Sequence, residues 1–366
     1  MRIIACIDLD YFYAQCEEIL NPSIKDKPVI VCIYSGRGEE GGAVATANYI
    51  ARKYGVKSGM AISRAKKLLE KVEAFFIPAR IEIYEKISSR IMTIVQKYGD
   101  SFEQVSIDEA FLDITKISNE SYENGFELMK KMKEEIYNKE GLTCSVGIGP
   151  SKAIAKIASG INKPNGLTLV KPEDIPKVIW PLPVNELLGV GSKTENIMKK
   201  LGIKTIGDLA NYDPLKLISV FGKKIATYFI LASQGKDVEP VKPAEQNKQY
   251  SRMITLKEST LNYKEILPYL DTLAKELSSE LKYNKVLAKG IGIIAILDDF
   301  STVSKSTILN SPTDSYEEIK EISEKLLREL IPKCNKLIRR LSLRAYNLMY
   351  MNKSLSLLEY LTPSQS

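Results

Sequence analysis

The stretch CIDLDYFYAQ, residues 6–15, joins an apolar strand to carboxylates and then to a run of aromatic rings. Apolar residues from Ile3 to Ile7 predict a short buried strand that ends at Asp8. Asp10 comes just before a helical pattern, where it suits an N-cap. A carboxylate beside a core strand is costly unless it is compensated. The stretch therefore predicts a site at the end of this strand.

A second acidic stretch, FEQVSIDEAFLDIT at residues 102–115, reads as two strands that meet at a turn near Asp108 and Glu109. Several carboxylates together repel one another, and divalent metal relieves this repulsion. An acid on a first strand and an acidic pair on a later hairpin are typical of a two-metal site for phosphoryl chemistry. The alternative is that Asp108 only marks a turn.

Composition limits the chemistry that these acids can perform. The chain has 366 residues, 44% of them hydrophobic, so more than one domain is expected. A net charge of +7 suits a polyanionic partner such as nucleic acid. Histidine is absent, so any bound metal ion needs oxygen ligands, which Mg²⁺, Mn²⁺ and Ca²⁺ accept.

The scattered cysteines include no C-x-x-C motif and favour a reducing setting. No apolar run reaches membrane-spanning length, so we expect a soluble, cytoplasmic protein without a membrane partner.

The chain divides into four blocks. Strands and helices alternate to about residue 170, which predicts α/β structure, with a Gly-rich turn leading into the helix that carries Arg52. Residues 171–237 predict short helices broken by glycine, as two helix-turn-helix units. A polar segment with prolines follows. Residues 248–352 predict a β-α-β-β-α-β domain. This segment contains twelve Lys and five Arg against four Asp and nine Glu, an excess of four positive charges.

Five stretches occur in order: CIDLDYFYAQCEE, GAVATANYIARKYGVKSGM, VSIDEAFLDIT, GIGPSKAIAKIAS and NKPNGL. Together they resemble a Y-family DNA polymerase of the DinB, or DNA polymerase IV, class, most closely its archaeal members. The resemblance implies a multidomain α/β and α+β fold, a right-hand polymerase. The implied domains are the palm at 1–11 and 82–170, the fingers at 12–81, the helix-hairpin-helix thumb at 171–237, a linker at 238–247, the little finger at 248–352 and a flexible tail at 353–366.

The resemblance also implies a metal site. Asp8, Asp108 and Glu109 are the implied catalytic ligands of two Mg²⁺ ions, with the backbone carbonyl of Leu9 as a further ligand. Mn²⁺ or Ca²⁺ is expected to substitute in binding. The family often has phenylalanine at position 9, but a carbonyl ligand does not depend on the side chain.

The resemblance implies that the aromatic residues of the first stretch take part in nucleotide binding. By the resemblance, Tyr13 matches the family's steric gate, whose ring would exclude a ribose 2′-hydroxyl by volume, and Tyr11 and Phe12 would shape the floor beneath the dNTP. The alternative is that these rings pack in the core, which suits Phe12 best. The implied triphosphate contacts are Thr46, Tyr49, Arg52 and Lys163. Without the resemblance, Arg52 would be interpreted as a solvated surface residue, and a surface role in a turn is the alternative for Lys163.

Contacts to primer-template DNA are implied at the thumb and the little finger. In the thumb, glycines let the backbone approach phosphate and lysines add charge; these residues are Gly189, Gly191, Lys193, Lys223 and Lys224. Ordinary helix connections are the alternative. In the little finger, Arg339 and Arg340 match template contacts, and a charged edge strand is the alternative.

The implied activity is low-fidelity DNA synthesis past damaged template bases by a monomer. In the tail, Leu357, Tyr360 and Leu361 resemble a sliding-clamp-binding peptide, although Ser354 stands where glutamine is usual; a frayed terminus is the alternative. Two other functions stay open. A palm-type nucleotidyl cyclase shares paired acids and metals but needs no primer, and a structural DNA-binding protein needs no metal.

Overall fold

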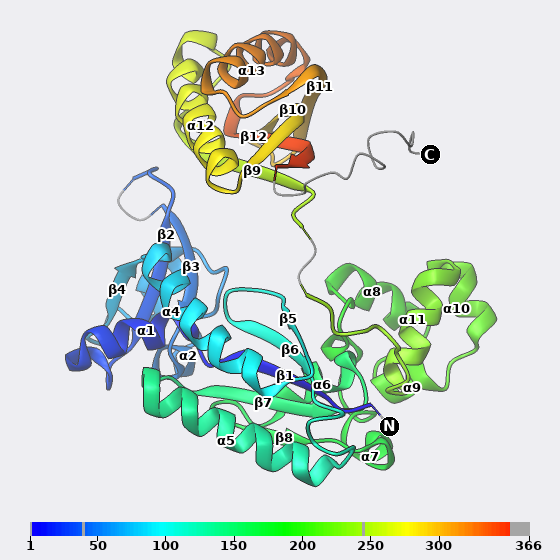
Figure 1. The fold of residues 1–366 in the computed structure, drawn as a ribbon. Helices are drawn as coiled ribbons and strands as arrows, with labels where there is room; N and C mark the ends of the chain where they lie inside the picture. The colour runs from blue at the N-terminus through cyan, green and yellow to red at the C-terminus, as the bar shows by residue number, and fades with distance from the viewer. Residues whose placement is uncertain (1, 39–40, 244–245, 352–366) are drawn as a thin grey trace. The chain divides into compact units, whose positions relative to one another are not determined.

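The computed structural model describes residues 2–38, 41–243 and 246–351. They form two compact units, drawn in Figure 1. The first comprises residues 2–33, 44–60 and 64–243, and the second comprises residues 34–38, 41–43, 61–63 and 246–351. Within these described ranges, no helix combines the length and the apolar character needed to cross a bilayer. Cys6 and Cys144 are buried free thiols.

The first unit contains a five-stranded sheet in the order β5-β6-β1-β7-β8. Strand β1 (Ile4–Leu9) pairs antiparallel with β6 (Glu109–Asp113) on one side and with β7 (Cys144–Gly149) on the other. The outer strands are β5 (Ser101–Gln104) and β8 (Leu167–Leu169). The predicted hairpin is therefore β5-β6, and its turn brings an acidic pair beside the end of β1.

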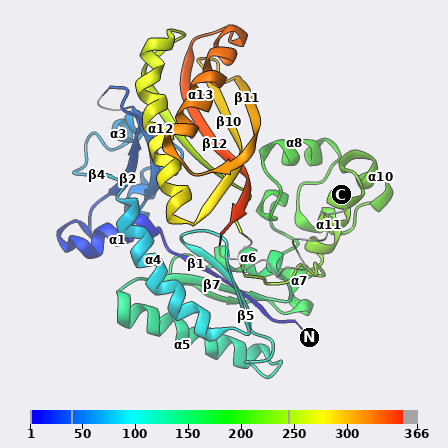
Figure 2. The same ribbon diagram turned by 45° about the horizontal axis from the view of Figure 1, so that its top comes forward.

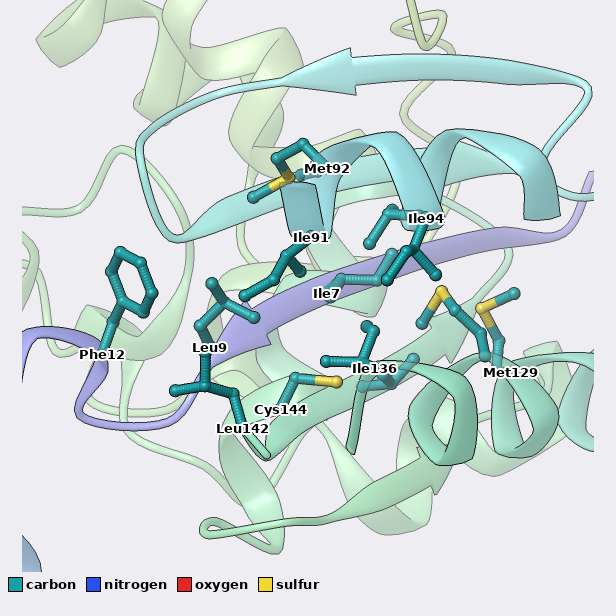
Figure 3. Close-up of a cluster of buried hydrophobic side chains, with 14 of the residues drawn as sticks. Ile7, Leu9, Phe12, Ile91, Met92, Ile94, Met129, Ile136, Leu142 and Cys144 are labelled. Atoms are coloured by element: carbon teal, nitrogen blue, oxygen red, sulfur yellow. The ribbon is translucent and has the colours of Figure 1, made fainter. Parts of the chain in front are cut away.

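The two faces of β1 meet different helices, because successive side chains of a strand point to opposite faces. Ile7 and Leu9 pack against α4 (Ile81–Val95) and α5 (Tyr122–Glu140), as Figure 3 shows. Ile4 and Cys6 instead pack with Ala155 of α6 (Lys152–Ile161). Asp8 has the same parity as Ile4 and Cys6, so its side chain belongs to the face that α6 covers.

Helix α6 lies unusually close to the sheet. Its first turn is capped by Ser151, whose hydroxyl accepts a hydrogen bond from Ile154 N. At Gly147 on β7, an added Cβ would lie 2.1 Å from Ser159 N and 2.2 Å from Ala155 O. Only glycine fits there. Because Gly147 has no side chain, α6 can lie close enough to the sheet to reach the strand ends.

A smaller sheet in the order β3-β2-β4 follows β1 in the chain. The sequence predicted that a Gly-rich turn leads directly into a helix, and this was wrong, because β3 (Gly42–Ala47) intervenes. Asn48 then caps α2 (Tyr49–Lys53) by accepting a 2.9 Å hydrogen bond from Ala51 N. The other elements of this region are α1 (Phe12–Leu20), η1 (Pro22–Ile24), β2 (Val29–Tyr34), α3 (Ile62–Leu68), β4 (Phe75–Pro78) and, after α4, η2 (Gln96–Tyr98).

Short helices follow β8, as predicted: η3 (Pro172–Asp174), α7 (Ile175–Val178), η4 (Val184–Glu186), α8 (Ser192–Lys200), α9 (Ile206–Ala210), α10 (Pro214–Phe221) and α11 (Lys223–Ser233). The first helix-turn-helix unit differs from the prediction. The segment before Gly189 forms only the 3₁₀ turn η4, because Pro183 precedes it and Gly189 has a φ of +88°. The second helix-turn-helix unit is a helix pair, α10 and α11, joined at Gly222.

The segment after α11 packs on the five-stranded sheet. Val241 is only 7% exposed and lies in the same buried cluster as Ile4 and Cys6. Arg2 donates hydrogen bonds to the carbonyls of Asp237, at 3.2 Å, and Glu239, at 2.6 Å. This part of the chain thus covers the same sheet face as α6.

The second unit has the predicted β-α-β-β-α-β order, visible in Figures 1 and 2. Its elements are β9 (Gln249–Thr260), α12 (Tyr263–Tyr283), β10 (Val286–Leu297), β11 (Thr302–Thr313), α13 (Tyr316–Leu330), η5 (Ile331–Lys333) and β12 (Ile338–Tyr350). The sheet order is β11-β10-β12-β9, and both helices pack on one face. The other face carries the alternate residues of β12, which include Arg340 and Arg344.

Candidate active site

Asp8 and Glu109 lie directly opposite each other on β1 and β6. The antiparallel register pairs Asp8 with Glu109, just as it pairs Cys6 with Phe111. Directly opposite Cβ atoms are about 4.5–5.5 Å apart, and like charges at such positions are destabilising. The fold therefore places two carboxylates of the predicted site side by side and requires a positive charge between them.

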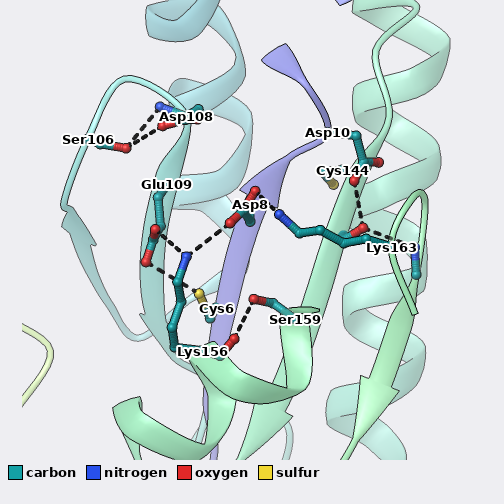
Figure 4. Close-up of polar contacts among 12 residues, drawn as sticks. Cys6, Asp8, Asp10, Ser106, Asp108, Glu109, Cys144, Lys156, Ser159 and Lys163 are labelled. Atoms are coloured by element: carbon teal, nitrogen blue, oxygen red, sulfur yellow. Dashed lines mark hydrogen bonds and ion pairs between the residues drawn. The ribbon is translucent and has the colours of Figure 1, made fainter. Parts of the chain in front are cut away.

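Two lysines supply that charge, as Figure 4 shows. Lys156 on α6 donates hydrogen bonds to Asp8 Oδ2 at 3.0 Å and to Glu109 Oε2 at 2.5 Å. Lys163, in the loop after α6, donates to Asp8 Oδ1. Burial lowers the pKa of Lys156, but Cys6, Asp8 and Glu109 outweigh this effect and raise its pKa overall. Lys156 is therefore a firmly charged ammonium group.

Asp108 precedes Glu109 at the end of the hairpin turn. Its backbone carbonyl accepts a 2.9 Å hydrogen bond from Leu9 N, which ties the turn to the end of β1. Its carboxylate accepts a 2.5 Å hydrogen bond from the Ser106 hydroxyl. Among the described residues, no three acidic or sulfur side chains group closely enough to hold a metal ion. The role of the three acids as joint metal ligands thus stays a prediction.

Asp10 does not cap a helix, so that prediction was wrong. It is fully buried, and its carboxylate accepts hydrogen bonds from the hydroxyls of Thr143 (2.8 Å) and Ser145 (2.7 Å) and from Asn165 N (2.8 Å). Helix α1 follows Tyr11, which has a left-handed conformation and no side-chain cap. The strength of three hydrogen bonds to one buried carboxylate explains why Asp10 turns away from the helix. Asp10 thereby holds the loop that carries Lys163.

A cavity of about 350 Å³ opens beside these acids. Residues that the sequence singled out line most of it, namely Asp8, Leu9, Tyr11, Phe12, Tyr13, Thr46, Tyr49, Arg52, Asp108 and Lys163. The remaining lining residues are Ala45, Ser58 and Ile107. Glu109 is not part of the lining but is linked to it through Lys156. A cavity that combines carboxylates, ammonium and guanidinium groups and aromatic rings suits a phosphorylated aromatic ligand.

The basic and aromatic residues of the cavity support one another. The Arg52 guanidinium lies 4.9 Å above the Tyr49 ring, and its Nε donates a 2.9 Å hydrogen bond to Ala47 O. The Tyr49 ring meets the Tyr11 ring edge-to-face at 5.3 Å. Phe12 is 2% exposed and mainly a core residue, as expected. This packing holds Arg52 in one place beside the cavity.

The predicted DNA contacts are not among the residues that line the cavity. Gly189, Gly191, Lys193 and Lys223 are exposed around α8 and the start of α11. Arg339 and Arg340 in the second unit are partly buried, and their Nε atoms find no hydrogen-bond partner within the described part of the chain. No contact in the structure assigns these residues to DNA, so they stay predictions.

Sequence reasoning missed Lys156, although a signal was present. It lies between Ala155 and Ile157, both buried, on a helix of small apolar residues. A lysine within such an apolar run needs an anionic partner. The acids at the strand ends were the available partners, but the register that brings them to α6 is visible only in the fold.

Comparison with known proteins identifies the family. Residues 7–160 match the impB/mucB/samB family and residues 247–357 match the C-terminal domain of that family. Residues 185–237 match the thumb domain of DNA polymerase-iota. Over 365 residues the chain is 42% identical to DNA polymerase IV of Methanosarcina acetivorans, covering 98% of this chain and 99% of that protein. The chain belongs to the DNA polymerase IV family. It is also 39% identical over 360 residues to DNA polymerase IV of Saccharolobus solfataricus, covering 97% and 98% of the two chains.

Solved structures agree with this membership in the polymerase IV family. A Y-family DNA polymerase chimera of Dbh and Dpo4 matches with a TM-score of 0.88 at 39% identity, covering 95% of this chain and 99% of that chain. An insertion ternary complex of Dbh DNA polymerase matches with a TM-score of 0.68 at 38% identity, with the same coverage. The right-hand polymerase fold is thereby confirmed.

As a member of this family, the protein is a DNA-directed DNA polymerase of the translesion class. Enzymes of this class depend on divalent metal ions. The cyclase and the non-enzymatic DNA-binding protein are thereby set aside, because neither accounts for a match over nearly the whole length of polymerases.

Proposed function

We propose that the cavity beside Asp8 and Asp108 is the nucleotidyl-transfer site of this polymerase. The observation that carries the proposal is the lining itself, which gathers acids from the strand ends with Tyr13, Tyr49 and Arg52. In the reaction, the 3′-oxygen of a primer bonds to the α-phosphorus of a dNTP, the bond to the bridging oxygen breaks, and pyrophosphate leaves. The proposed partners are thus primer-template DNA and a dNTP.

The carboxylates at the strand ends have the charge and the oxygen donors that a divalent metal ion requires. Asp8 and Glu109 face each other, and two ammonium groups now offset their charge. We assign Asp8, Asp108 and Glu109, with the Leu9 carbonyl, to two Mg²⁺ ions, for which Mn²⁺ or Ca²⁺ can substitute in binding. When bound, such a pair activates the attacking oxygen and stabilises the leaving oxygen. The chain's own part is to hold the carboxylates in register on a rigid sheet.

Cationic and hydroxyl groups around the cavity suit the triphosphate. Arg52 offers a fork of donors and is held by Tyr49 and Ala47, so it loses little freedom on binding. Lys163 adds a point charge, with Thr46 and Tyr49 as further donors. Tyr11 and Phe12 would form the floor beneath the sugar, and Tyr13 would exclude a ribose 2′-hydroxyl by its volume.

The domain assignment also belongs to the proposal. We assign the palm to residues 1–11 and 82–170, the fingers to 12–81, the thumb to 171–237, the linker to 238–247 and the little finger to 248–352. The match of residues 185–237 to a thumb domain supports the third of these. Duplex DNA would contact the thumb and little finger at Gly189, Gly191, Lys193, Lys223, Arg339 and Arg340.

The remaining expectations concern partners and location. The clamp-binding peptide around Leu357 and Tyr360 lies outside the described residues and stays a proposal for residues 353–366. We keep a monomer as the expected active form. Because DNA and deoxynucleotides are the proposed substrates, we keep the cytoplasm as the expected location.

Primer extension with the D108A and E109A variants tests the proposal. Each should abolish Mg²⁺-dependent dNTP incorporation while primer-template binding stays within about threefold of wild type, because the acids act on the reacting phosphate rather than on the duplex. Asp113→Ala, on the same β-strand as Glu109, is the matched control and should retain incorporation. Near-normal turnover by either active-site variant would overturn the metal assignment.

A further inference from the structure

The Tyr13 ring is backed by a second tyrosine. Tyr13 stacks on Tyr84 with ring centroids 4.5 Å apart and an interplanar angle of 18°. Tyr13 lines the cavity, whereas Tyr84 does not and is fully buried. Tyr84 also meets the Phe12 ring edge-on at 6.5 Å. The ring behind Tyr13 is therefore itself enclosed by packing.

A buried carboxylate fixes the far end of Tyr84. The Tyr84 hydroxyl donates a 2.5 Å hydrogen bond to Glu17 Oε1. Glu17 is 2% exposed and also accepts a 2.9 Å hydrogen bond from Arg80 Nε, with a second Arg80 nitrogen bonded to Oε2. Burial and the Glu17 bond raise the pKa of Tyr84, so its hydroxyl remains a donor.

Helical spacing explains how four residues meet in this way. Tyr13 and Glu17 are four residues apart on α1, and Arg80 and Tyr84 are four residues apart at the start of α4. Residues at this spacing share a helix face. Helix α1 thus supplies the cavity ring and the carboxylate, and α4 supplies the backing ring and the guanidinium group.

Selection by volume requires a ring that does not yield. A tyrosine at a cavity wall can move to another rotamer when a ligand presses on it. The stack with Tyr84 opposes that movement, because Tyr84 cannot move without breaking its bond to Glu17 inside the core. The hydrogen bond far from the sugar would therefore determine how firmly the cavity ring resists a 2′-hydroxyl.

We propose that Tyr84, held by Glu17 and Arg80, is a positioning residue for sugar selection that keeps the Tyr13 ring in place against ribonucleotides. The inference deepens the proposed function and rests on the role of Tyr13 as the steric gate. Neither Glu17 nor Arg80 touches the nucleotide in this proposal, and both act through Tyr84.

The test is the ratio of kcat/KM for a dNTP to kcat/KM for the matching rNTP, measured in primer extension. Tyr84→Leu should lower this ratio roughly tenfold or more, the scale of discrimination that pocket packing supplies. The change should come mainly from better rNTP use. Tyr84→Phe, which keeps the ring and loses the hydroxyl, should lower the ratio less. The matched control is Tyr98→Phe, because Tyr98 donates a similar 2.6 Å hydrogen bond to Glu135 and does not line the cavity.

Each outcome decides the proposal. A folded Y84L enzyme with the wild-type ratio overturns it, and so does an equal loss of kcat/KM for both substrates, which indicates only structural damage. If Y84L does not fold, Y84F and Glu17→Gln serve instead, and an unchanged ratio in both overturns the proposal. Tyr13→Ala tests the steric-gate role of Tyr13 separately from the positioning role of Tyr84. If Y13A leaves the ratio unchanged, the assignment of Tyr13 as the gate fails. If Y13A admits rNTPs but the Tyr84 and Glu17 variants do not, only the positioning role fails.

Discussion

Lys156 donates a 2.5 Å hydrogen bond to Glu109, from a helix on one face of the sheet to the first residue of an adjacent strand. The same ammonium group bonds to Asp8, so one lysine holds two of the proposed metal ligands. Without bound metal, this lysine offsets the repulsion between two carboxylates that the strand register places opposite each other. The relationship makes the site stable in its metal-free form.

We therefore expect Lys156→Met to destabilise the metal-free enzyme by about 1–3 kcal/mol, the range for losing hydrogen bonds to charged groups. Millimolar Mn²⁺ should restore much of this loss, because a divalent ion relieves the same repulsion. Thermal unfolding in chelator and in Mn²⁺ measures both effects. Lys152→Met is the matched control on α6, since Lys152 pairs with Glu103 instead. Equal rescue of both variants by Mn²⁺ would contradict the expectation.

Asp10→Asn should raise the KM for dNTP several-fold with little change in kcat. The amide cannot accept all three hydrogen bonds of the buried carboxylate, so the loop that carries Lys163 loosens. Steady-state kinetics measures the effect. Asp100→Asn is the control, because Asp100 also anchors backbone amides, at Lys116 and Ile117, outside the cavity. Equal KM values for both variants and the wild type would remove the positioning role of Asp10.

Arg52→Lys should lower kcat/KM for dNTP by about tenfold, which corresponds to about 1.4 kcal/mol. Lysine keeps the charge, but it loses the fork of donors and the Nε bond to Ala47 that orients the guanidinium group. Single-nucleotide incorporation kinetics checks this, with the exposed Arg64→Lys as control. If R52K matches R64K, then charge alone accounts for the contribution of Arg52.

Local rules explain which parts of this site the sequence could predict. Asp8 lies at the end of an apolar strand, and Asp108 and Glu109 lie at a turn between two strands, so periodicity places all three. Lys156 and Tyr84 escaped prediction because their partners are distant in sequence and meet only through strand register and helix packing. Asp10 was misassigned because a local cap and a long-range hydrogen-bond network compete for the same carboxylate. The strand β3 was missed because its small residues and the glycine at its start resemble a turn.

Val241→Asp should destabilise the first unit by about 2–4 kcal/mol. Val241 is 7% exposed among Ile4, Cys6, Phe111 and Ala155, where an aspartate finds no compensating charge in its buried cluster. Val238→Asp makes the same substitution three residues earlier, where the side chain is 80% exposed, and should be nearly neutral. Thermal unfolding of the full chain compares the two. Similar melting temperatures would show that the segment after α11 contributes little to the sheet.

Arg340→Ala should weaken primer-template binding similarly for all sequences and reduce its salt dependence. The residue lies on β12, on the sheet face without helices, and its side chain is partly exposed, so we expect its guanidinium group to reach a phosphate. Each phosphate contact contributes close to one unit to the slope of log Kd against log salt, and losing one should lower that slope by about one. Fluorescence anisotropy across a salt series measures the slope. Arg328→Ala is the control, because Arg328 lies on α13 and donates a 3.0 Å hydrogen bond to Tyr263. If both variants keep the wild-type slope, Arg340 makes no phosphate contact. The sheet face without helices then binds DNA through other residues or not at all.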